Sequence, residues 1–158
     1  MATIKAHLDQ AVQRGARTSA GGAGSGESED LRPLKVVIVD DNVEFLKYLE
    51  GHLAELGFKA ILESASERAL ECIRRNGPDL VMLDLLMPDP DGLEILTALK
   101  ADPKLAAIPV MMVSAKEDEE YLIQAFDLGA ADYLIKPFRL PELKARVRKV
   151  LRDRAAEE

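Results

Sequence analysis

The chain has 158 residues, of which 47% are hydrophobic and 31% charged, and this length and composition fit one globular domain better than two. Its net charge of −7 at pH 7 makes direct binding to nucleic acid unfavourable. A single cysteine, Cys72, excludes a disulfide framework, and its helical surroundings indicate a buried thiol in a reducing compartment. No apolar run reaches the ~18 residues of a membrane span, and the N-terminal residues lack the pattern of a signal peptide. We therefore expect a cytoplasmic protein.

Residues 1–33 differ in composition from the rest and are expected to form a flexible N-terminal extension. Residues 15–30 are rich in glycine, alanine and serine and contain no large apolar side chain, so they cannot bury enough surface to offset chain entropy. Ahead of them, four apolar residues recur at helical spacing: Ile4, Leu8, Ala11 and Val12. This spacing allows either a short amphipathic helix or a frayed tail, and the sequence leaves both open.

From residue 34 onward, strand and helix patterns alternate, which predicts a folded domain over 34–153 and a short C-terminal tail over 154–158. Apolar runs rich in branched residues indicate strands at 35–39, 59–65, 79–83, 110–113 and 132–135. A helical pattern follows each strand, and the first helix stops at Gly57. The alternation predicts an α/β fold with right-handed crossovers, a doubly wound five-stranded parallel sheet in the order 2-1-3-4-5.

A polar or charged residue stands at the end of four of these strands. Asp40 and Asp41 follow the first strand, Asp84 the third, Ser114 the fourth and Lys136 the fifth. Because the carboxyl ends of parallel strands meet at one edge of a sheet, these side chains should converge there. Three nearby carboxylates repel one another unless a divalent cation such as Mg²⁺ and the Lys136 ammonium balance their charge. The alternative is a set of ordinary loop acids in an acidic protein.

Four segments, VVIVDDN, LVMLDLLMPDPDG, VMMVSA and GAADYLIKPF, resemble the sequence blocks of the receiver domain of two-component response regulators, which has the CheY-like, flavodoxin-like fold. The resemblance covers residues 34 to about 153. It implies that Asp84 is the phosphoacceptor and takes a phosphoryl group from a histidine kinase or a phosphotransfer protein. It also implies that Asp41 binds Mg²⁺ directly and Asp40 mostly through water, with Asp84 and the backbone carbonyl of Leu86 as further ligands. Such a domain catalyses only its own phosphorylation and dephosphorylation.

The resemblance also implies how the phosphoryl group would be sensed. Ser114 would donate a hydrogen bond to a phosphoryl oxygen, Lys136 would pair with the phosphate, and Tyr133 matches the switch aromatic of the family. The alternative role for Ser114 is to cap the helix that follows its strand. The switch would alter one surface, which a downstream effector protein would read: residues 116–128, 132–136 and 140–152.

Other positions depart from the pattern of dimerising, DNA-binding relatives. Ala131 replaces the first of two acids before the switch aromatic, although Asp132 can still pair with Arg146. Leu122 stands where a basic partner for Glu142 would be expected, so an oligomer remains possible without being predicted.

Further expectations concern the core and the rim of the site. A cis peptide bond is expected between Lys136 and Pro137. Leu86 replaces a polar residue of relatives that lose phosphate quickly, which predicts slow self-dephosphorylation. The core should include the side chains of Met111, Met112, Phe126 and Phe138.

Two other classes of protein share part of this pattern. A hydrolase of the haloacid dehalogenase type uses an aspartyl nucleophile with Mg²⁺, but it needs a second acid two residues later, where this chain has Leu86. A scaffold that has the fold but no longer uses phosphate would be expected to lose an acid or the lysine, and none is missing. Only RAAEE follows residue 153, so we expect output through a partner protein or the 1–33 extension.

Overall fold

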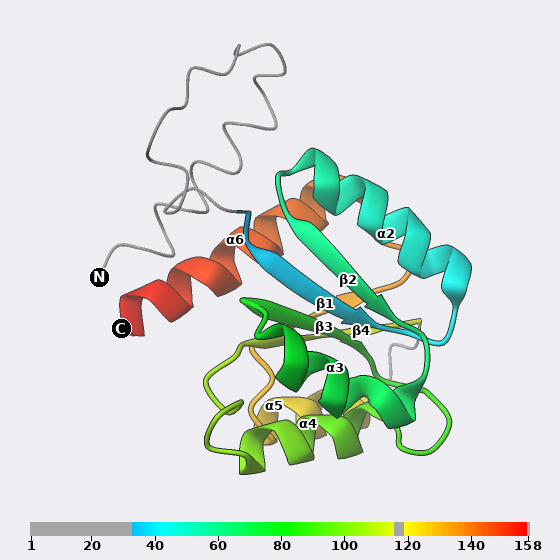
Figure 1. The fold of residues 1–158 in the computed structure, drawn as a ribbon, viewed down its shortest axis with the longest axis vertical. Coiled ribbons are helices and arrows are strands. Elements are labelled where there is room, and N and C mark those ends of the chain that lie inside the picture. The colour runs from blue at the N-terminus through cyan, green and yellow to red at the C-terminus, as the bar shows by residue number, and fades with distance from the viewer. Residues whose placement is uncertain (1–32, 116–118, 158) are drawn as a thin grey trace.

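In the computed structural model, which describes residues 33–115 and 119–157, a parallel sheet of five strands forms the centre of the protein (Figure 1). The strand order is β2-β1-β3-β4-β5, which confirms the predicted fold class. The strands are β1 (Lys35–Val39), β2 (Lys59–Glu63), β3 (Leu80–Asp84), β4 (Val110–Ser114) and β5 (Asp132–Ile135). Much of the predicted 1–33 extension, and the first residues of the predicted 116–128 helix, lie outside the described residues.

Helices cover both faces of the sheet, as Figure 1 shows. Helices α2 (Val43–Glu55) and α6 (Leu140–Glu157) lie on one face. The other face is covered by α3 (Ala69–Asn76), which follows the short 3₁₀ helix η2 (Ser66–Arg68), and by α4 (Gly92–Ala101) and α5 (Glu119–Asp127). No helix among the described residues is long and apolar enough to span a membrane.

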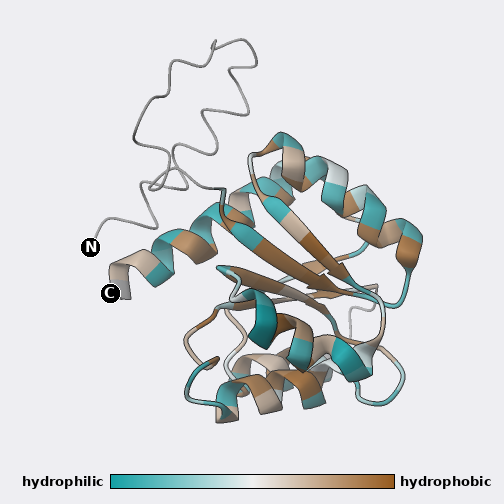
Figure 2. Cartoon of the chain, in the orientation of Figure 1, coloured by the Kyte–Doolittle hydropathy of each residue, from teal (hydrophilic) through white to brown (hydrophobic). Residues whose placement is uncertain are grey.

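The hydrophobic core consists of two layers because side chains alternate across each strand. In β1, Val36 and Ile38 pack with α2 and α6, whereas Val37 and Val39 pack with the helices of the other face. All residues of β3 and β4 are buried, as strands covered on both faces require. Figure 2 shows these largely hydrophobic strands between helices of mixed hydropathy.

Backbone contacts bring α4 close to the end of β3. The amide of Gly92 donates a hydrogen bond to the carbonyl of Leu85 (3.0 Å), and a Cβ at Gly92 would lie 2.3 Å from the carbonyl oxygen of Asp84. Asp91 caps the helix through the amide of Glu94, whose carboxylate accepts a hydrogen bond from the amide of Asp91. Glycine at this position therefore allows the close approach that fixes the loop after Asp84.

The structure confirms several detailed expectations about the interior and corrects that for Phe126. Met111 and Met112 are fully buried, Cys72 is buried, and the Lys136–Pro137 bond is cis, as is Asp89–Pro90. Phe138 is partly buried against the core. The expectation of Phe126 in the core is wrong: its side chain is 44% exposed. The neighbouring Ala125 points inward from α5 instead, and the next helical residue is rotated by about 100° from it.

Helix α6 continues through most of the stretch expected as a tail. It ends at Glu157, whereas the helical pattern suggested an end near residue 153. Two contacts hold the added turn: Ala155 packs against the core, and Arg154 donates a hydrogen bond to the carbonyl of Asp79 (3.1 Å). The pair of alanines in this turn also has high helix propensity.

Candidate functional site

Three carboxylates meet at the carboxyl edge of the sheet. Asp40 follows β1 and Asp84 ends β3, and these strands are neighbours in the sheet. Carboxylate oxygens of Asp40, Asp41 and Asp84 lie within 4.8 Å of one another. Asp40 and Asp84 are buried, while Asp41 is exposed. The structure thus brings together the three acids that the sequence placed at two strand ends.

Lys136 adds one positive charge to this cluster. Its ammonium lies 2.7 Å from Oδ2 of Asp40, and the side chain of Lys136 is 19% exposed. The backbone amide of Lys136 also donates a hydrogen bond to the carbonyl of Ser114 (2.7 Å). The end of β5 is thereby fixed to the end of β4, and the lysine is directed back across the sheet toward β1.

Backbone amides orient two of the carboxylates. The amide of Asn42 donates to Oδ1 of Asp40 (2.8 Å), and the amide of Leu86 donates to Oδ1 of Asp84 (3.3 Å). Each acid thus accepts a bond from the residue two positions later. The turn that follows each strand therefore holds its own acid in the cluster.

Burial and the neighbouring Asp40 carboxylate raise the pKa of Asp84 from 3.8 to about 6, against the lowering influence of Lys136 and of the Leu86 amide. A single ammonium therefore does not balance the three acids. A cluster of carboxylate oxygens is the donor set of a hard cation such as Mg²⁺. The residues present fit a divalent cation, and such a cation would lower the pKa of Asp84 again.

Leu86, Ser114 and Tyr133 occupy different places around this cluster. The side chain of Leu86 is 42% exposed at the rim, and its carbonyl as a metal ligand stays a prediction. Ser114 is buried at the end of β4, next to the Asp84 strand. Tyr133 is half-buried on β5, where its ring forms a T-shaped pair with that of Phe126 and lies 5.1 Å from the Arg146 guanidinium.

The predicted pair of Asp132 and Arg146 is present. Nη1 of Arg146 lies 2.7 Å from Oδ1 of Asp132, and its Nε lies 3.2 Å from Oε2 of Glu142. Although burial lowers it, both carboxylates raise the pKa of Arg146, with a net upward shift. Glu142 thus pairs with Arg146 of its own helix, whereas Leu122 offers it no charge, and dimerisation through this surface stays without a prediction.

Phe45, which the sequence analysis did not single out, also belongs to the site. The Lys136 ammonium lies 4.0 Å from the centroid of its ring. The sequence contained one usable signal: Phe45 stands four residues after Asp41, in the first turn of α2, and this turn borders the strand ends. Its pairing with a lysine far along the chain is not visible from spacing.

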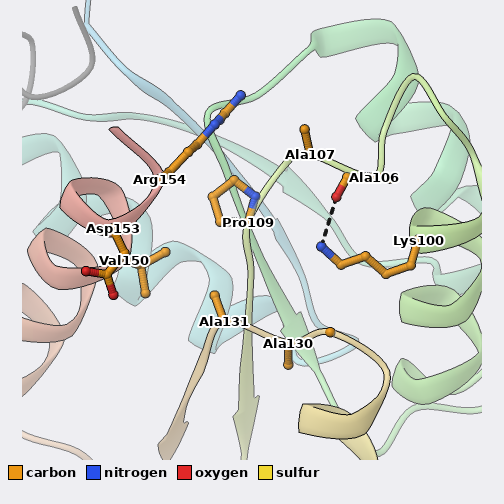
Figure 3. A pocket seen from close by; sticks show the side chains of 10 residues that line it. Lys100, Ala106, Ala107, Pro109, Ala130, Ala131, Val150, Asp153 and Arg154 are labelled. Atoms are coloured by element: carbon orange, nitrogen blue, oxygen red, sulfur yellow. Dashed lines mark hydrogen bonds between the residues drawn. The ribbon is translucent and has the colours of Figure 1, made fainter. Parts of the chain in front are cut away.

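A hollow of about 500 Å³ lies at the opposite edge of the sheet, lined mainly by small side chains of two loops and by α6 (Figure 3). Lys100 donates a hydrogen bond to the carbonyl of Ala106 (3.0 Å), and Arg154 donates one to the carbonyl of Asp79. Both cations therefore stabilise the backbone of the fold. None of the predicted site residues lines this hollow.

Comparison with known proteins gives one consistent result. The sequence model of the response regulator receiver domain matches residues 36–148. The protein named "Probable transcriptional regulator ycf27" of Porphyridium aerugineum is 38% identical over 118 residues, which are 75% of this chain and 48% of that protein. The alkaline phosphatase synthesis transcriptional regulatory protein PhoP of Bacillus subtilis is 35% identical with the same coverage. The chain thus spans about half the length of these curated relatives.

A solved structure supports the same comparison. The BeF3-activated N-terminal receiver domain of RstA from Klebsiella pneumoniae matches with a TM-score of 0.68 and 29% identity. The match covers 75% of this chain and 98% of that one. The matched three quarters of this chain therefore correspond to nearly the whole of that receiver domain.

Proposed function

The chain belongs to the response regulator receiver domain family, and we propose that it is a phosphoacceptor switch in which Asp84 takes a phosphoryl group from a histidine kinase or a phosphotransfer protein. The observation that carries this proposal is the buried Asp84 beside Asp40, Asp41 and Lys136 at one edge of the sheet. Phosphoryl transfer depends mainly on positioning and on neutralising charge. This cluster supplies a nucleophile, a cation site and an ammonium in one place.

Four groups of the chain would hold Mg²⁺: the carboxylates of Asp40, Asp41 and Asp84 and the backbone carbonyl of Leu86. When bound, Mg²⁺ supplies positive charge to the phosphoryl oxygens. Asp40 keeps Lys136 at the site through the 2.7 Å ion pair. The amide of Leu86 orients the Asp84 carboxylate, which leaves its second oxygen as the nucleophile.

Transfer forms a bond between a carboxylate oxygen of Asp84 and phosphorus, while the bond from phosphorus to the donor breaks. The leaving group keeps the bonding electron pair; a histidine imidazole then takes a proton from the solvent, and a carboxylate leaving group such as acetate needs none. The aspartyl phosphate carries a charge of about −2 where the carboxylate carried −1. Lys136 and the Ser114 hydroxyl are the groups of this chain that would bind the added charge.

Output would pass through the surface of α5, β5 and α6, which a separate effector protein would read. Tyr133 contacts Phe126 of α5 and Arg146 of α6, so a movement of its ring alters both helices. Ile123 and Phe126 of α5 are 54% and 44% exposed, which gives a partner protein an apolar contact area. Phosphate can bias this surface only through contacts that differ between the two states, and Ser114 with Tyr133 would make them.

Intact-mass measurement after incubation with Mg²⁺ and a small phosphodonor tests the proposal. A single phosphoryl group adds ~80 Da, and it should need the cation. Asp84→Ala should abolish the addition, and Asp41→Ala should weaken it greatly. Asp127→Ala, which removes an exposed acid of α5, is the matched control and should behave as the wild type. An unchanged addition in Asp84→Ala would overturn the assignment.

A further inference from the structure

The ammonium of Lys136 lies between two groups of opposite character. Oδ2 of Asp40 is 2.7 Å from Nζ, and the centroid of the Phe45 ring is 4.0 Å from it. A cation within about 6 Å of an aromatic centroid, over the face of the ring, is attracted by the negative charge of that face. Lys136 is largely shielded from water, and removal of water strengthens this attraction.

The Phe45 ring is itself well held. The amide of Phe45 donates a hydrogen bond to Oδ1 of Asn42, which caps α2 (3.1 Å). The ring meets that of Phe138 edge to face, with centroids 6.0 Å apart and planes at 84°, and stacks against Tyr48 at 6.3 Å. Phe138 follows Lys136 by two residues, so the packing fixes the ring relative to the same loop that carries the lysine.

We propose that Phe45 is a positioning residue for Lys136, whose ring face holds the ammonium beside the acids before a phosphoryl group arrives. A lysine side chain is long and flexible, and ordering it at the moment of transfer costs entropy. The Phe45 ring and Asp40 order it beforehand. The inference rests on the proposed phosphoacceptor function and adds a role for a residue outside the acid cluster.

Loss of the ring face should weaken the binding of a phosphoryl group without weakening the binding of the cation. A mobile Lys136 would bind a phosphoryl oxygen less well, so phosphate mimics would bind more weakly. The same mobile lysine would neutralise Asp40 less, so the acids would hold Mg²⁺ equally well or more tightly. A role of Phe45 in general packing would instead weaken both, because both depend on the ordered strand ends.

The test compares Phe45→Leu and Phe45→Tyr with the wild type by calorimetric titration, first with Mg²⁺ and then with beryllofluoride in excess Mg²⁺. In Phe45→Leu, beryllofluoride affinity and the rate of phosphorylation by acetyl phosphate should fall about three- to tenfold, as expected for loss of a partly shielded cation–π contact. Mg²⁺ affinity should stay equal or rise. Phe45→Tyr keeps the ring face and should remain within about twofold of the wild type.

Tyr48→Leu is the matched structural control. It removes the neighbouring ring of α2, while the Phe45 ring keeps its edge-to-face contact with Phe138 and its face under Lys136, so all three quantities should stay near the wild-type values. Nuclear magnetic resonance adds an independent readout: the ε-methylene protons of Lys136 should shift upfield in the wild type and in Phe45→Tyr, and lose that shift in Phe45→Leu. If Phe45→Leu does not fold, the same measurements are made with 3,5-difluorophenylalanine at position 45. Its fluorine atoms withdraw charge from the ring at nearly constant shape.

The outcomes separate the two proposals. If the wild-type chain binds both ligands and their affinities are unchanged in Phe45→Leu, or in the fluorinated protein where that is used, the positioning role of Phe45 is overturned. The proposed phosphoacceptor function is not affected by that result. Parallel loss of Mg²⁺ and beryllofluoride affinity in Phe45→Leu overturns the positioning role also, in favour of general packing. A wild-type chain that binds neither ligand and accepts no phosphoryl group overturns the proposed function together with this inference.

Discussion

Gly92→Ala should disrupt the turn that carries Asp84. A Cβ at this position would lie 2.3 Å from the carbonyl oxygen of Asp84, 2.8 Å from Cα of Leu85 and 2.9 Å from its carbonyl oxygen. All three atoms belong to the backbone, so no side chain can rotate out of the way. Overpacking of this kind costs about 1–3 kcal/mol or more, and the gain in helix propensity at a first-turn position is smaller. We expect a net loss of about 2 kcal/mol in the free energy of unfolding.

Gly51→Ala supplies the matched control, because the substitution is the same and the surroundings differ. Gly51 lies in the middle of α2, with nothing within 4 Å of its would-be Cβ. Alanine there should stabilise the protein by up to about 1 kcal/mol. The stability of both variants is measured by urea unfolding, from the shift of the unfolding midpoint at a constant slope of free energy against urea concentration. Gly92→Ala should also slow phosphorylation of the folded protein, since α4 can move away only by shifting the loop after Asp84.

A Gly92→Ala protein as stable as Gly51→Ala would show that a Cβ at position 92 meets no clash. A Gly92→Ala protein that loses stability but accepts phosphate at the wild-type rate would show that the close approach has no bearing on the site.

Three further predictions concern the acids, the rim and the output surface. With divalent cations chelated, Asp84→Asn should raise the free energy of unfolding by about 2 kcal/mol near pH 8. Because the pKa of Asp84 is about 6 in the folded protein and 3.8 as the ordinary value, the penalty for ionising Asp84 disappears as the pH falls through 6 to about 4. A gain that does not depend on pH would contradict this prediction. Leu86→Asn should shorten the lifetime of the phosphoprotein, since an amide can orient an attacking water and an alkyl side chain cannot; an equal or longer lifetime in a gel or mass assay counts against it. Hydrogen exchange with beryllofluoride and Mg²⁺ should change at 119–127 and 132–152 as well as at the strand ends, and changes confined to the loops after 40, 84 and 114 would show that the output surface is wrong.

Much of the site could be predicted because it depends on backbone topology. The alternation of strands and helices implies a parallel sheet, and a parallel sheet brings its carboxyl ends to one edge. Asp40 and Asp84 follow from that rule alone, without knowledge of any side-chain conformation. The Asp132–Arg146 pair was also within reach, since it joins opposite charges on a strand and the helix that follows it.

The unpredicted features depend on how individual side chains turn. The cation–π contact of Phe45 joins the first and fifth βα units through a rotamer that no spacing encodes. The sequence predicts Phe126 in the core because apolar residues lie on two sides of this helix and either side could face inward. In the structure, α5 buries the side that contains Ala125 and leaves Phe126 exposed. The role of Gly92 needed the position of α4 relative to β3, which only the folded chain provides.

The short strand β5 links the charge of the site to the outer surface. Asp132 and Tyr133 lie in β5 and Lys136 directly follows its last residue, Ile135, so a shift of this short strand would move all three. Its end carries the lysine that binds Asp40, and its start carries the acid that binds Arg146 of α6. A phosphoryl group on Asp84 would compete with Asp40 for Lys136 and pull that end toward β3. Because Tyr133 contacts Phe126 of α5 and Arg146 of α6, a pull on Lys136 would act together with the contact between Ser114 and the phosphoryl group to alter the packing of both helices.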